Sequence, residues 1–565
     1  MDYQPSPADV GRLLFDLLDA PAHWQRLAVH ADTDTALARQ VLEEAAAFVA
    51  GQVAPLRRVG DEAGCRYDSA TGSVATPPGF ADAYRAFWQA GWPGLSVAPE
   101  DGGQGLPPVL EAVLYEWLSA ANLAWTMAPG LLHGAYECLR HHGDETLRRA
   151  WLPKIASGEW LATMCLTEAH AGSDLGLVCT RAEPQPDGSL RVSGDKIFIS
   201  GGEHDLSGNI VHLVLGRLPD APPGPRGLSL FLVPRLLEDG ARNGVVCQGI
   251  EKKMGLHGSP TCALRFDAAV GWLVGEPQRG LAAMFVMMNA ARLHVGLQGI
   301  GQLDAAWQMA DAYANERRQM RAPVRPAAAP DADLLAEHPA MRRILDTQRA
   351  WIDGGRLVAY RCALALDDSH RHADAPDRAS AERWCSFATP VLKAAWTAQG
   401  FLGASECLQV FGGHGYVRDW GIEQVVRDAR VTMIYEGTNE IQAIDLLVRK
   451  VLPDRGDALA GWLGDLLAEC PDAGSRERFE GLARRLRHVT GAVCDAATKD
   501  VALPNRVADD YLQAVALLLM AWAWERIGAK FTGEARWQLP AQAARQRVLP
   551  GFDLRLALVR AQIDA

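Results

Sequence analysis

The chain has 565 residues, of which 48% are apolar and 22% are charged, an ordinary composition for a globular protein of several domains. The net charge of −12 argues against a general nucleic-acid or anionic-membrane binder, because such partners demand a cationic face. Eleven scattered cysteines without a CxxC pair argue against disulfides or a zinc motif, so we expect reduced thiols, no metal and a cytoplasmic location.

Residues 1–160 are predicted to form an N-terminal α-helical domain. The first ten residues are polar and acidic and have no signal-peptide core. Apolar residues then recur at helical spacing over Ala36–Val53, Phe80–Ala90 and Pro108–Leu118. Glycines and prolines mark Pro99–Pro107 as a loop between these helices.

Residues 161–270 are predicted to form a middle β domain. Short β-type runs are separated there by Gly, Pro, Asp and Asn clusters. The predicted strands are Leu161–Leu166, Leu190–Val192, Lys196–Ser200, Ile210–Gly216, Leu228–Val233 and Cys262–Phe266.

Two segments of this β domain offer polar backbone and hydroxyl groups. Met164–Asp174, reading MCLTEAHAGSD, ends a strand and continues into a loop whose N–H groups can bind an anion or the polar edge of a cofactor ring. Lys196–His204, reading KIFISGGEH, ends in two glycines that let backbone lie against a flat ligand beside Phe198. Taken alone, each segment is better explained as an ordinary turn after a strand.

Helical periodicity returns near Leu281 and predicts a helical domain over residues 271–455, followed by a helical extension over 456–565. Helices and strands segregated in this way indicate an α+β arrangement of separate domains. The longest apolar run, Ala514–Trp524, is shorter than the ~18–20 residues that cross a bilayer, so we expect no membrane span.

A carboxylate within an apolar stretch is the most informative feature of the third domain. Val431–Glu440, reading VTMIYEGTNE, places Glu436 before Gly437 and Thr438, and helical spacing resumes at Ile441. We expect Glu436 to lie just ahead of a helix that Thr438 caps. A half-buried carboxylate has a raised pKa and can act as a general base near neutral pH, although a salt-bridged structural glutamate is the equal alternative.

The glycine clusters of the third domain do not predict a dinucleotide fold. In Leu408–Trp420 the GGHG sequence lacks both the GxGxxG spacing and a preceding strand. The glycines of Gly296–Gly301 lie in a helical pattern, where they more often mark close helix packing. Arginine can bind phosphate through two hydrogen bonds, and we expect at most two helical arginines of this domain to do so.

Five segments in order and spacing resemble the acyl-CoA dehydrogenase family over about residues 36–452. They are TEAHAGSD at 167–174, FIS at 198–200, YANERRQ at 313–319, LQVFGGHGY at 408–416 and IYEGTNEIQ at 434–442. The resemblance implies an N-terminal helical domain, a middle β-barrel-like domain, a C-terminal four-helix bundle and an extra helical extension. It also implies a flavoprotein oxidoreductase of fatty-acid β-oxidation.

In this resemblance Glu436 is the catalytic base, which takes the α-proton of an acyl-CoA thioester while the β-hydride passes to N5 of FAD and a trans-2-enoyl-CoA forms. A second branch of the family carries its base at the position of Ala291, which cannot accept a proton. The resemblance places substrate contacts at Ser173, Arg292 and Gly437. It places FAD contacts at Cys165, Thr167, Gly172, Ser173, Phe198, Ser200, Arg317, Gln409, Gly412, Gly413 and Thr438.

The segment beyond Leu452 is similar to the long branch of the family, which includes broad-range bacterial acyl-CoA dehydrogenases and 3-methylmercaptopropionyl-CoA dehydrogenases. The resemblance implies an electron-transfer flavoprotein as acceptor and at least a homodimer, because two chains complete each flavin site. The alternatives are an acyl-CoA oxidase and a DNA-associated alkylation-response flavoprotein of the same fold. Residues 455–565 carry no basic excess to support DNA binding.

Overall fold

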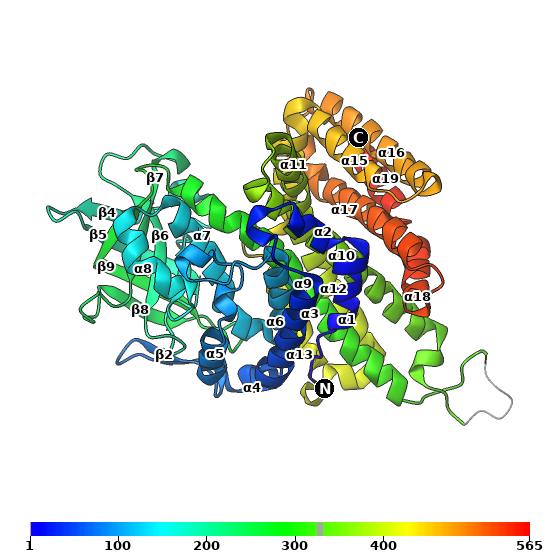
Figure 1. Ribbon diagram of the computed structural model, residues 1–565, viewed down its shortest axis with the longest axis horizontal. Coiled ribbons are helices and arrows are strands. Elements are labelled where there is room, and N and C mark those ends of the chain that lie inside the picture. The colour runs from blue at the N-terminus through cyan, green and yellow to red at the C-terminus, as the bar shows by residue number, and fades with distance from the viewer. Residues whose placement is uncertain (1, 325–330, 565) are drawn as a thin grey trace. The chain divides into compact units, whose positions relative to one another are not determined.

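The computed structural model describes residues 2–324 and 331–564 and divides into two compact units. The sheet unit comprises Phe48–Glu111 and Ala121–Ala291, and the helical unit comprises Met1–Ala47, Ala112–Ala120 and Arg292–Ala565 (Figure 1). The α+β class that the sequence predicts is confirmed. The bounds of the four domains predicted from the sequence stay a prediction.

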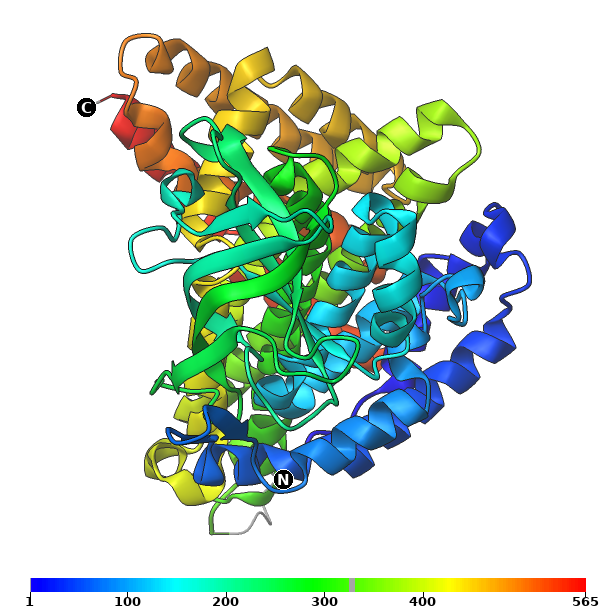
Figure 2. The same ribbon diagram turned by 90° about the vertical axis from the view of Figure 1, so that its left-hand side faces the viewer.

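The sheet unit is built on seven strands that close into a barrel-like ring. The strands are β3 Leu161–Cys165, β4 Arg181–Pro184, β5 Leu190–Ser200, β6 Ile210–Arg217, β7 Leu228–Pro234, β8 Val245–Ile250 and β9 Thr261–Val274. They follow the order β3-β6-β4-β5-β9-β7, the additional β6–β7 pairing closes the ring, and β8 pairs with β9. Figure 2 shows these strands curling around one another. Every residue of β7 is buried, as its apolar run, broken only by Ser229, predicts.

Four strands are absent from the sequence-based prediction, and a fifth strand joins two of the predicted runs. A small hairpin, β1 Arg66–Asp68 with β2 Ser73–Ala75, lies in a region predicted to be helical. The short β4 carries two charged residues, and the apolar run of β8 stops after three residues at Gln248, so neither shows a long apolar run. The two runs 190–192 and 196–200 are one strand, β5, because Gly194–Asp195 forms part of an irregular register with β9 instead of a turn.

Short helices accompany the strands in the sheet unit. They are α4 Leu56–Ala63, α5 Phe80–Gln89, α7 Leu132–His142 and α8 Glu145–Ala156. α8 begins where Asp144 accepts a hydrogen bond from the N–H of Leu147, and Trp151 on its buried face packs against Trp272 of β9. The α8 helix therefore lies against the strand that runs through the centre of the sheet.

Long helices form the core of the helical unit. They are α9 Gly280–Glu316, which begins in the sheet unit, α10 Pro339–Arg371, α11 Ala375–Val391 and α12 Thr397–Val410. Gly299 lies so close to α12 that an added Cβ would stand 2.4 Å from the carbonyl oxygen of Trp396. At Gly301 the same addition would meet the carbonyl oxygen of Glu116 at 2.6 Å. The prediction that the GLQGIG glycines mark close helix packing is confirmed.

The C-terminal extension is part of the helical unit. Its helices are α15 Asp457–Ala468, α16 Ala473–Ala497, α17 Leu503–Lys530, α18 Ala535–Ala543 and α19 Gly551–Ile563. The α17 helix packs against α10 and against α14 Asn439–Ile444, and the indole N–H of Trp524 donates to the carbonyl oxygen of Ala350 at 3.1 Å. Within residues 2–324 and 331–564, no helix combines the length and apolarity that crossing a bilayer requires.

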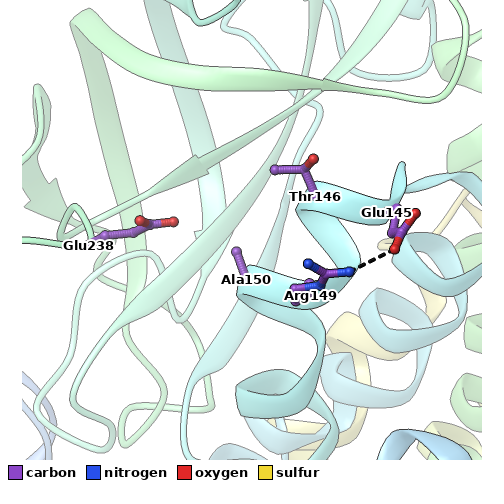
Figure 3. Close-up of a pocket in the computed structure, with 5 residues that line it drawn as sticks. All are labelled: Glu145, Thr146, Arg149, Ala150 and Glu238. Atoms are coloured by element: carbon purple, nitrogen blue, oxygen red, sulfur yellow. Dashed lines mark hydrogen bonds and ion pairs between the residues drawn. The ribbon is translucent and has the colours of Figure 1, made fainter.

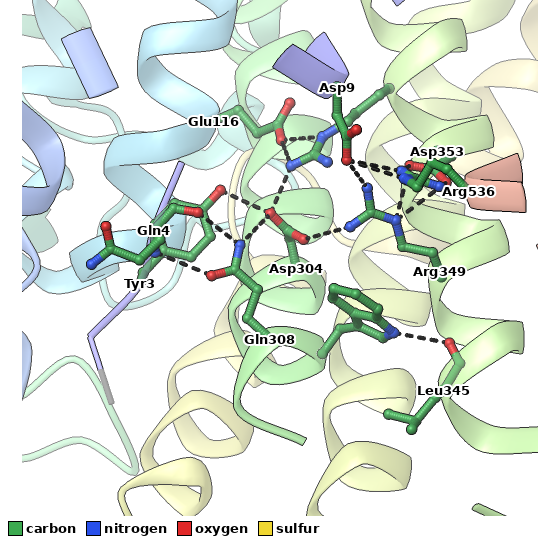
Figure 4. Close-up of polar contacts among 12 residues, drawn as sticks. Tyr3, Gln4, Asp9, Glu116, Asp304, Gln308, Leu345, Arg349, Asp353 and Arg536 are labelled. Atoms are coloured by element: carbon green, nitrogen blue, oxygen red, sulfur yellow. Dashed lines mark hydrogen bonds and ion pairs between the residues drawn. The ribbon is translucent and has the colours of Figure 1, made fainter. Parts of the chain in front are cut away.

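A buried network of charges joins distant parts of the helical unit (Figure 4). Arg356 of α10 pairs with Glu116 and with Asp304, each at 2.7 Å, and all three side chains are buried. The Tyr3 hydroxyl donates to Asp304 at 2.8 Å. Three residues before Arg356 on α10, Asp353 pairs with Arg536 of the extension at 2.8 Å, and Arg536 also pairs with Asp9 at 3.0 Å. Residues from both ends of the sequence thus meet on one helix.

Candidate active site

Glu436 lies in the turn between the 3₁₀ turn Arg430–Met433 and α14 Asn439–Ile444. Its backbone is left-handed, with φ 55°, and that of Gly437 follows with φ 82°. The Gln442 amide donates to the carbonyl oxygen of Glu436 at 3.1 Å, and the Thr438 hydroxyl accepts from the N–H of Ile441 at 3.3 Å. The prediction that Glu436 precedes a helix capped by Thr438 is confirmed.

The left-handed backbone at Glu436 costs conformational energy, because residues with a Cβ rarely adopt it. Substitution at Gly437 would be strained as well, since an added Cβ would stand 2.7 Å from the Gln442 amide. Strain of this kind persists where the surrounding structure imposes it. The turn therefore gives the half-buried Glu436 side chain a fixed place at the head of α14.

The environment of Glu436 suits a proton acceptor. Burial raises the pKa of Glu436 to about 7, while the positive charges of Lys393 and Arg292 oppose this rise. Burial likewise lowers the pKa of Lys393 to about 7, opposed by the negative charges of Glu436 and Glu440. A carboxyl with a pKa near neutrality can both accept and release a proton under ordinary conditions.

Lys393 is a functional candidate that sequence reasoning missed. It is fully buried, and its ammonium group donates to Oδ1 of Asn439, the first residue of α14, at 2.9 Å. Oδ1 of Asn439 also accepts from Thr397, and its amide group donates to the carbonyl oxygen of Ala394. The signal in the sequence is a lysine with apolar neighbours on both sides, in VLKAAW, where a solvated helix face would show polar residues.

Arg292 lies near the base, in a buried ion pair. Its guanidinium is 3.2 Å from Oδ2 of Asp445, whose carboxylate also lies 3.3 Å from the Lys450 ammonium group. Its positive charge lowers the pKa of Glu436. The structure therefore brings Arg292, Gly437 and Glu436 together, and the coenzyme A contact of Arg292 stays a prediction.

The remaining predicted residues of the helical unit lie elsewhere on its surface. The ring of Tyr313, near the end of α9, stacks on Phe411 at 4.2 Å and its hydroxyl bonds to His414 at 2.8 Å. These contacts hold the end of α9, with exposed Arg317, against the turn after α12. Gln409 near the end of α12 and Gly412 and Gly413 in that turn are exposed, and no atom lies within 4 Å of a Cβ added to either glycine.

In the sheet unit, the loop after β3 is fixed to β5. The N–H of Ile197 donates to the carbonyl oxygen of Thr167 at 2.9 Å, which places Thr167 beside Phe198. Phe198 has a left-handed backbone, with φ 59°, and its side chain is 59% exposed. Gly172 and Ser173 are exposed on the loop, and Ser200 is half-buried at the end of β5.

Cys165 differs from the other predicted cofactor contacts. Its thiol is fully buried in the barrel core, 3.4 Å from the Thr163 hydroxyl, and burial raises its pKa to about 12. Only the backbone of Cys165 is left for a ligand, and its role as a contact stays a prediction.

A buried ion pair holds the loop in place. The Lys196 ammonium group donates to Oε1 of Glu168 and to the carbonyl oxygen of Leu166, each at 2.9 Å. The other donors to the Glu168 carboxylate are Thr180 and the N–H of Cys179. Although burial raises the pKa of Glu168, Lys196 and these hydrogen bonds lower it to about 2. Glu168 is thus a charged anchor for the loop that carries Thr167 and Ser173.

A surface hollow of about 620 Å³ lies elsewhere in the sheet unit (Figure 3). Its lining contains Arg149 of α8, which forms an ion pair with Glu145 at 2.7 Å, and Glu238 on the loop after β7. No predicted site residue lines it. It is therefore not a candidate for the active site.

The predicted contact residues fit FAD by their chemistry. The loop of Gly172 and Ser173 offers exposed polar groups, and Phe198 offers an exposed aromatic face. Arg317 offers an exposed guanidinium suited to two hydrogen bonds with phosphate. The open backbone at Gly412 and Gly413 allows a ligand to approach closely.

Comparison with known proteins agrees with the resemblance noted from the sequence. Three family models match: acyl-CoA dehydrogenase N-terminal domain over residues 35–159, middle domain over 163–269 and C-terminal domain over 278–451. The chain is 42% identical to the 3-methylmercaptopropionyl-CoA dehydrogenase of Ruegeria pomeroyi, over 81% of this chain and 77% of that protein. It is 36% identical to the broad-specificity linear acyl-CoA dehydrogenase FadE5 of Mycobacterium tuberculosis, over 88% and 85%.

The fold is similar to that of a solved structure, Caenorhabditis elegans ACDH-11 in complex with C11-CoA. The TM-score is 0.79 at 20% identity, over 97% of this chain and 93% of that chain. The family models, the curated relatives and the fold agree, and the chain belongs to the acyl-CoA dehydrogenase family, whose members are FAD-dependent oxidoreductases.

Proposed function

We propose that the protein oxidises a saturated, linear acyl-CoA thioester to the trans-2-enoyl-CoA, with Glu436 as the base that removes the α-proton. The observation that carries this proposal is the position of Glu436, half-buried in a left-handed turn at the head of α14, with a pKa raised to about 7. A solvated structural glutamate would keep an acidic pKa and would be a weak base for a C–H bond.

The turn around Glu436 also fixes the orientation of the proposed base. The hydrogen bond from Gln442 to the carbonyl oxygen of Glu436 and the Thr438 cap fix the backbone on both sides of the acid. A base held in one position loses little entropy on reaching the transition state. We propose that the backbone N–H of Glu436 donates to the thioester carbonyl and stabilises the negative charge that develops as the α-proton leaves.

FAD, when bound, supplies the acceptor for the hydride that leaves the β-carbon. Judged by the chemistry of their side chains, Thr167, Ser173 and Phe198 would contact the flavin ring of FAD and the atoms next to it. Arg317 would contact the pyrophosphate of FAD. Gln409, Gly412 and Gly413 would contact the cofactor of a second chain.

The first test replaces Glu436 by glutamine. E436Q should keep its FAD and still bind acyl-CoA, but the rate of flavin bleaching by substrate should fall by at least roughly 10²–10⁴-fold, the range attributed to general-base catalysis. The matched control is E440Q, which neutralises an exposed acid in the first turn of α14, four residues after Glu436. Bleaching of E436Q at the wild-type rate would place the base elsewhere.

The second test concerns the substrate and the acceptor. The relatives named as a 3-methylmercaptopropionyl-CoA and a linear acyl-CoA dehydrogenase support an unbranched thioester as substrate. A series of saturated CoA esters from short to long chains, scored by flavin bleaching, would identify the preferred length. We propose an electron-transfer flavoprotein as acceptor, and rapid peroxide formation in air without any added acceptor would instead identify an oxidase.

A further inference from the structure

Three side chains of types that bind metal ions meet at the loop after β3, although the first and the last of them are 11 positions apart in the sequence. Glu168, His170 and Cys179 each offer one ligand atom, and the three atoms all lie within 4.8 Å of one another. Nε2 of His170 lies 3.6 Å from Oε2 of Glu168. The spacing has no metal-binding signature, so only the fold brings these residues together.

We propose that Glu168, His170 and Cys179 form a binding site for a zinc ion, with water as the fourth ligand. Imidazole nitrogen, thiolate sulfur and carboxylate oxygen are the ligands that Zn²⁺ prefers. The side chains already converge, because Nε2 of His170 is 3.0 Å and Sγ of Cys179 is 3.3 Å from the same carbonyl oxygen, that of Leu177.

The two carboxylate oxygens of Glu168 have different hydrogen-bond partners. Oε1 is held by Lys196 and Thr180, and Oε2 accepts from the N–H of Cys179 at 2.8 Å while facing His170. A metal ion on Oε2 therefore leaves the buried ion pair in place. Reciprocal hydrogen bonds between Glu168 and Ala171 form the turn that carries His170. Ligands fixed in this way by outer contacts bind metal more tightly.

The spacing of the ligand atoms is close to what zinc needs. Zn–ligand distances of about 2.0–2.3 Å imply tetrahedral edges of roughly 3.3–3.7 Å. Small rotations of His170 and Cys179 would shorten the longer separations to this range, and both side chains are exposed, which leaves them free to rotate and gives the ion a path from solvent. On binding, the Cys179 thiol gives its proton to solvent and its thiolate bonds to zinc, so affinity should fall as pH is lowered.

The site lies on the segment that carries Thr167 and Ser173. A bound ion would tie the turn of Glu168 and His170 to the strand entry at Cys179, and so restrict this loop. The inference does not rest on the proposed function, because its readout is uptake of metal.

The test uses the full-length, FAD-loaded protein freed of metal by a chelator and titrated with Co²⁺. A Co²⁺ ion bound by thiolate in a tetrahedral site gives d–d bands at the red end of the visible spectrum, away from the absorption of oxidised flavin. We expect one Co²⁺ per chain with these bands, and displacement of Co²⁺ by added Zn²⁺. In C179S the bands should disappear and Zn²⁺ affinity should fall by more than roughly 100-fold, the upper end for loss of an outer contact.

C65S is the matched control, since Cys65 is another partly accessible thiol, in the same sheet unit but outside the cluster. It should bind Co²⁺ as the wild type does. Equal FAD content in C65S, C179S and H170N would show that the variants are folded. The proposal is wrong if the red bands are absent from the wild type, or if binding survives both C179S and H170N. In the second case the exposed cluster of His372, Asp374 and Asp377 is the site to test next.

Discussion

At the scale of single residues, the proton affinity of Glu436 depends on the positive charges that lie near its carboxylate. Lys393 and Arg292 are the cations that act on Glu436, and Arg292 is already paired with Asp445. The hydrogen-bond acceptor of Lys393 is the neutral side chain of Asn439. Among the nearby carboxylates, Glu436 therefore has the strongest electrostatic interaction with Lys393. We therefore assign Lys393 as a positioning residue that sets the proton affinity of the base.

The pH dependence of flavin bleaching tests this role. Because the base must be ionised, the rate should rise with pH through about 7 in the wild type. K393M removes a positive charge that lowers the pKa of Glu436, so the midpoint should move to higher pH by about one unit, which means about tenfold less activity on the acidic side. K450M, which removes a neighbouring half-buried lysine paired with Asp445, is the control and should leave the midpoint nearly unchanged. An unshifted K393M profile would show that burial alone tunes the base.

At the scale of elements, buried charges specify how the helices of the helical unit pack. Arg356 of α10 reaches Glu116 on the short stretch Ala112–Ala120 and Asp304 on α9, while Tyr360 of α10 donates to Glu116 at 2.6 Å. Such pairs add little net stability, but removal of one partner leaves its counter-charges without compensation.

R356M should lower the free energy of unfolding by about 3–5 kcal/mol, measured by chemical denaturation. The loss should shrink on acidification, because burial raises the pKa of Glu116 and the variant lacks the Arg356 charge that opposes this rise, so the folded state takes up a proton at Glu116 first. R383M breaks a half-exposed pair with Asp465 and should cost at most about 1 kcal/mol. An equal loss in both variants would mean that burial of the network does not matter.

At the scale of the whole molecule, the open glycine turn after α12 supports a site shared between two chains. Gly413 has an ordinary backbone conformation and space around it, so a larger residue there meets no obstacle within its own chain. Any effect of such a residue must come from something that the turn contacts outside the chain.

We expect light scattering to give at least twice the 61.1 kDa mass of one chain. G413D should fold normally but lose FAD or dissociate, because its side chain would enter the neighbouring cofactor site with a negative charge. G481D, at an equally open glycine on α16, should retain both FAD and mass. A monomeric, FAD-loaded wild type would contradict the shared site.

Local patterns predicted much of this architecture. Elements whose sequence pattern is local could be predicted. They include β6 and β7, with their apolar runs, and α3 Thr35–Phe48 and α5, with their helical spacing of apolar residues. The turn at Glu436 was predictable for the same reason, since Gly437 and Thr438 adjoin the acid. Strand β8 was not, because its residues form a strand only by pairing with β9.

The parts of the site that depend on contacts between distant segments could not be predicted from the sequence. Lys393 and Glu436 are 43 positions apart, and nothing in either segment alone indicates that the other lies near. The ion pair of Glu168 with Lys196 and the gathering of Glu168, His170 and Cys179 likewise arise from the folding of the β3 loop onto β5 and β4. Charges that meet across the fold have no local signature.

The meeting of Asp9 and Arg536 on α10 has a consequence for how the protein is made. Arg349 of α10 itself lies 3.2 Å from Asp353, whereas Arg536 follows Asp353 by 183 positions along the chain. Until Arg536 is synthesised, Asp353 therefore has only one of these two arginine partners, and Asp9 lacks its contact with the extension. The base-bearing bundle therefore reaches its final packing after translation of the extension, and nascent chains halted before residue 536 should stay sensitive to protease along α10.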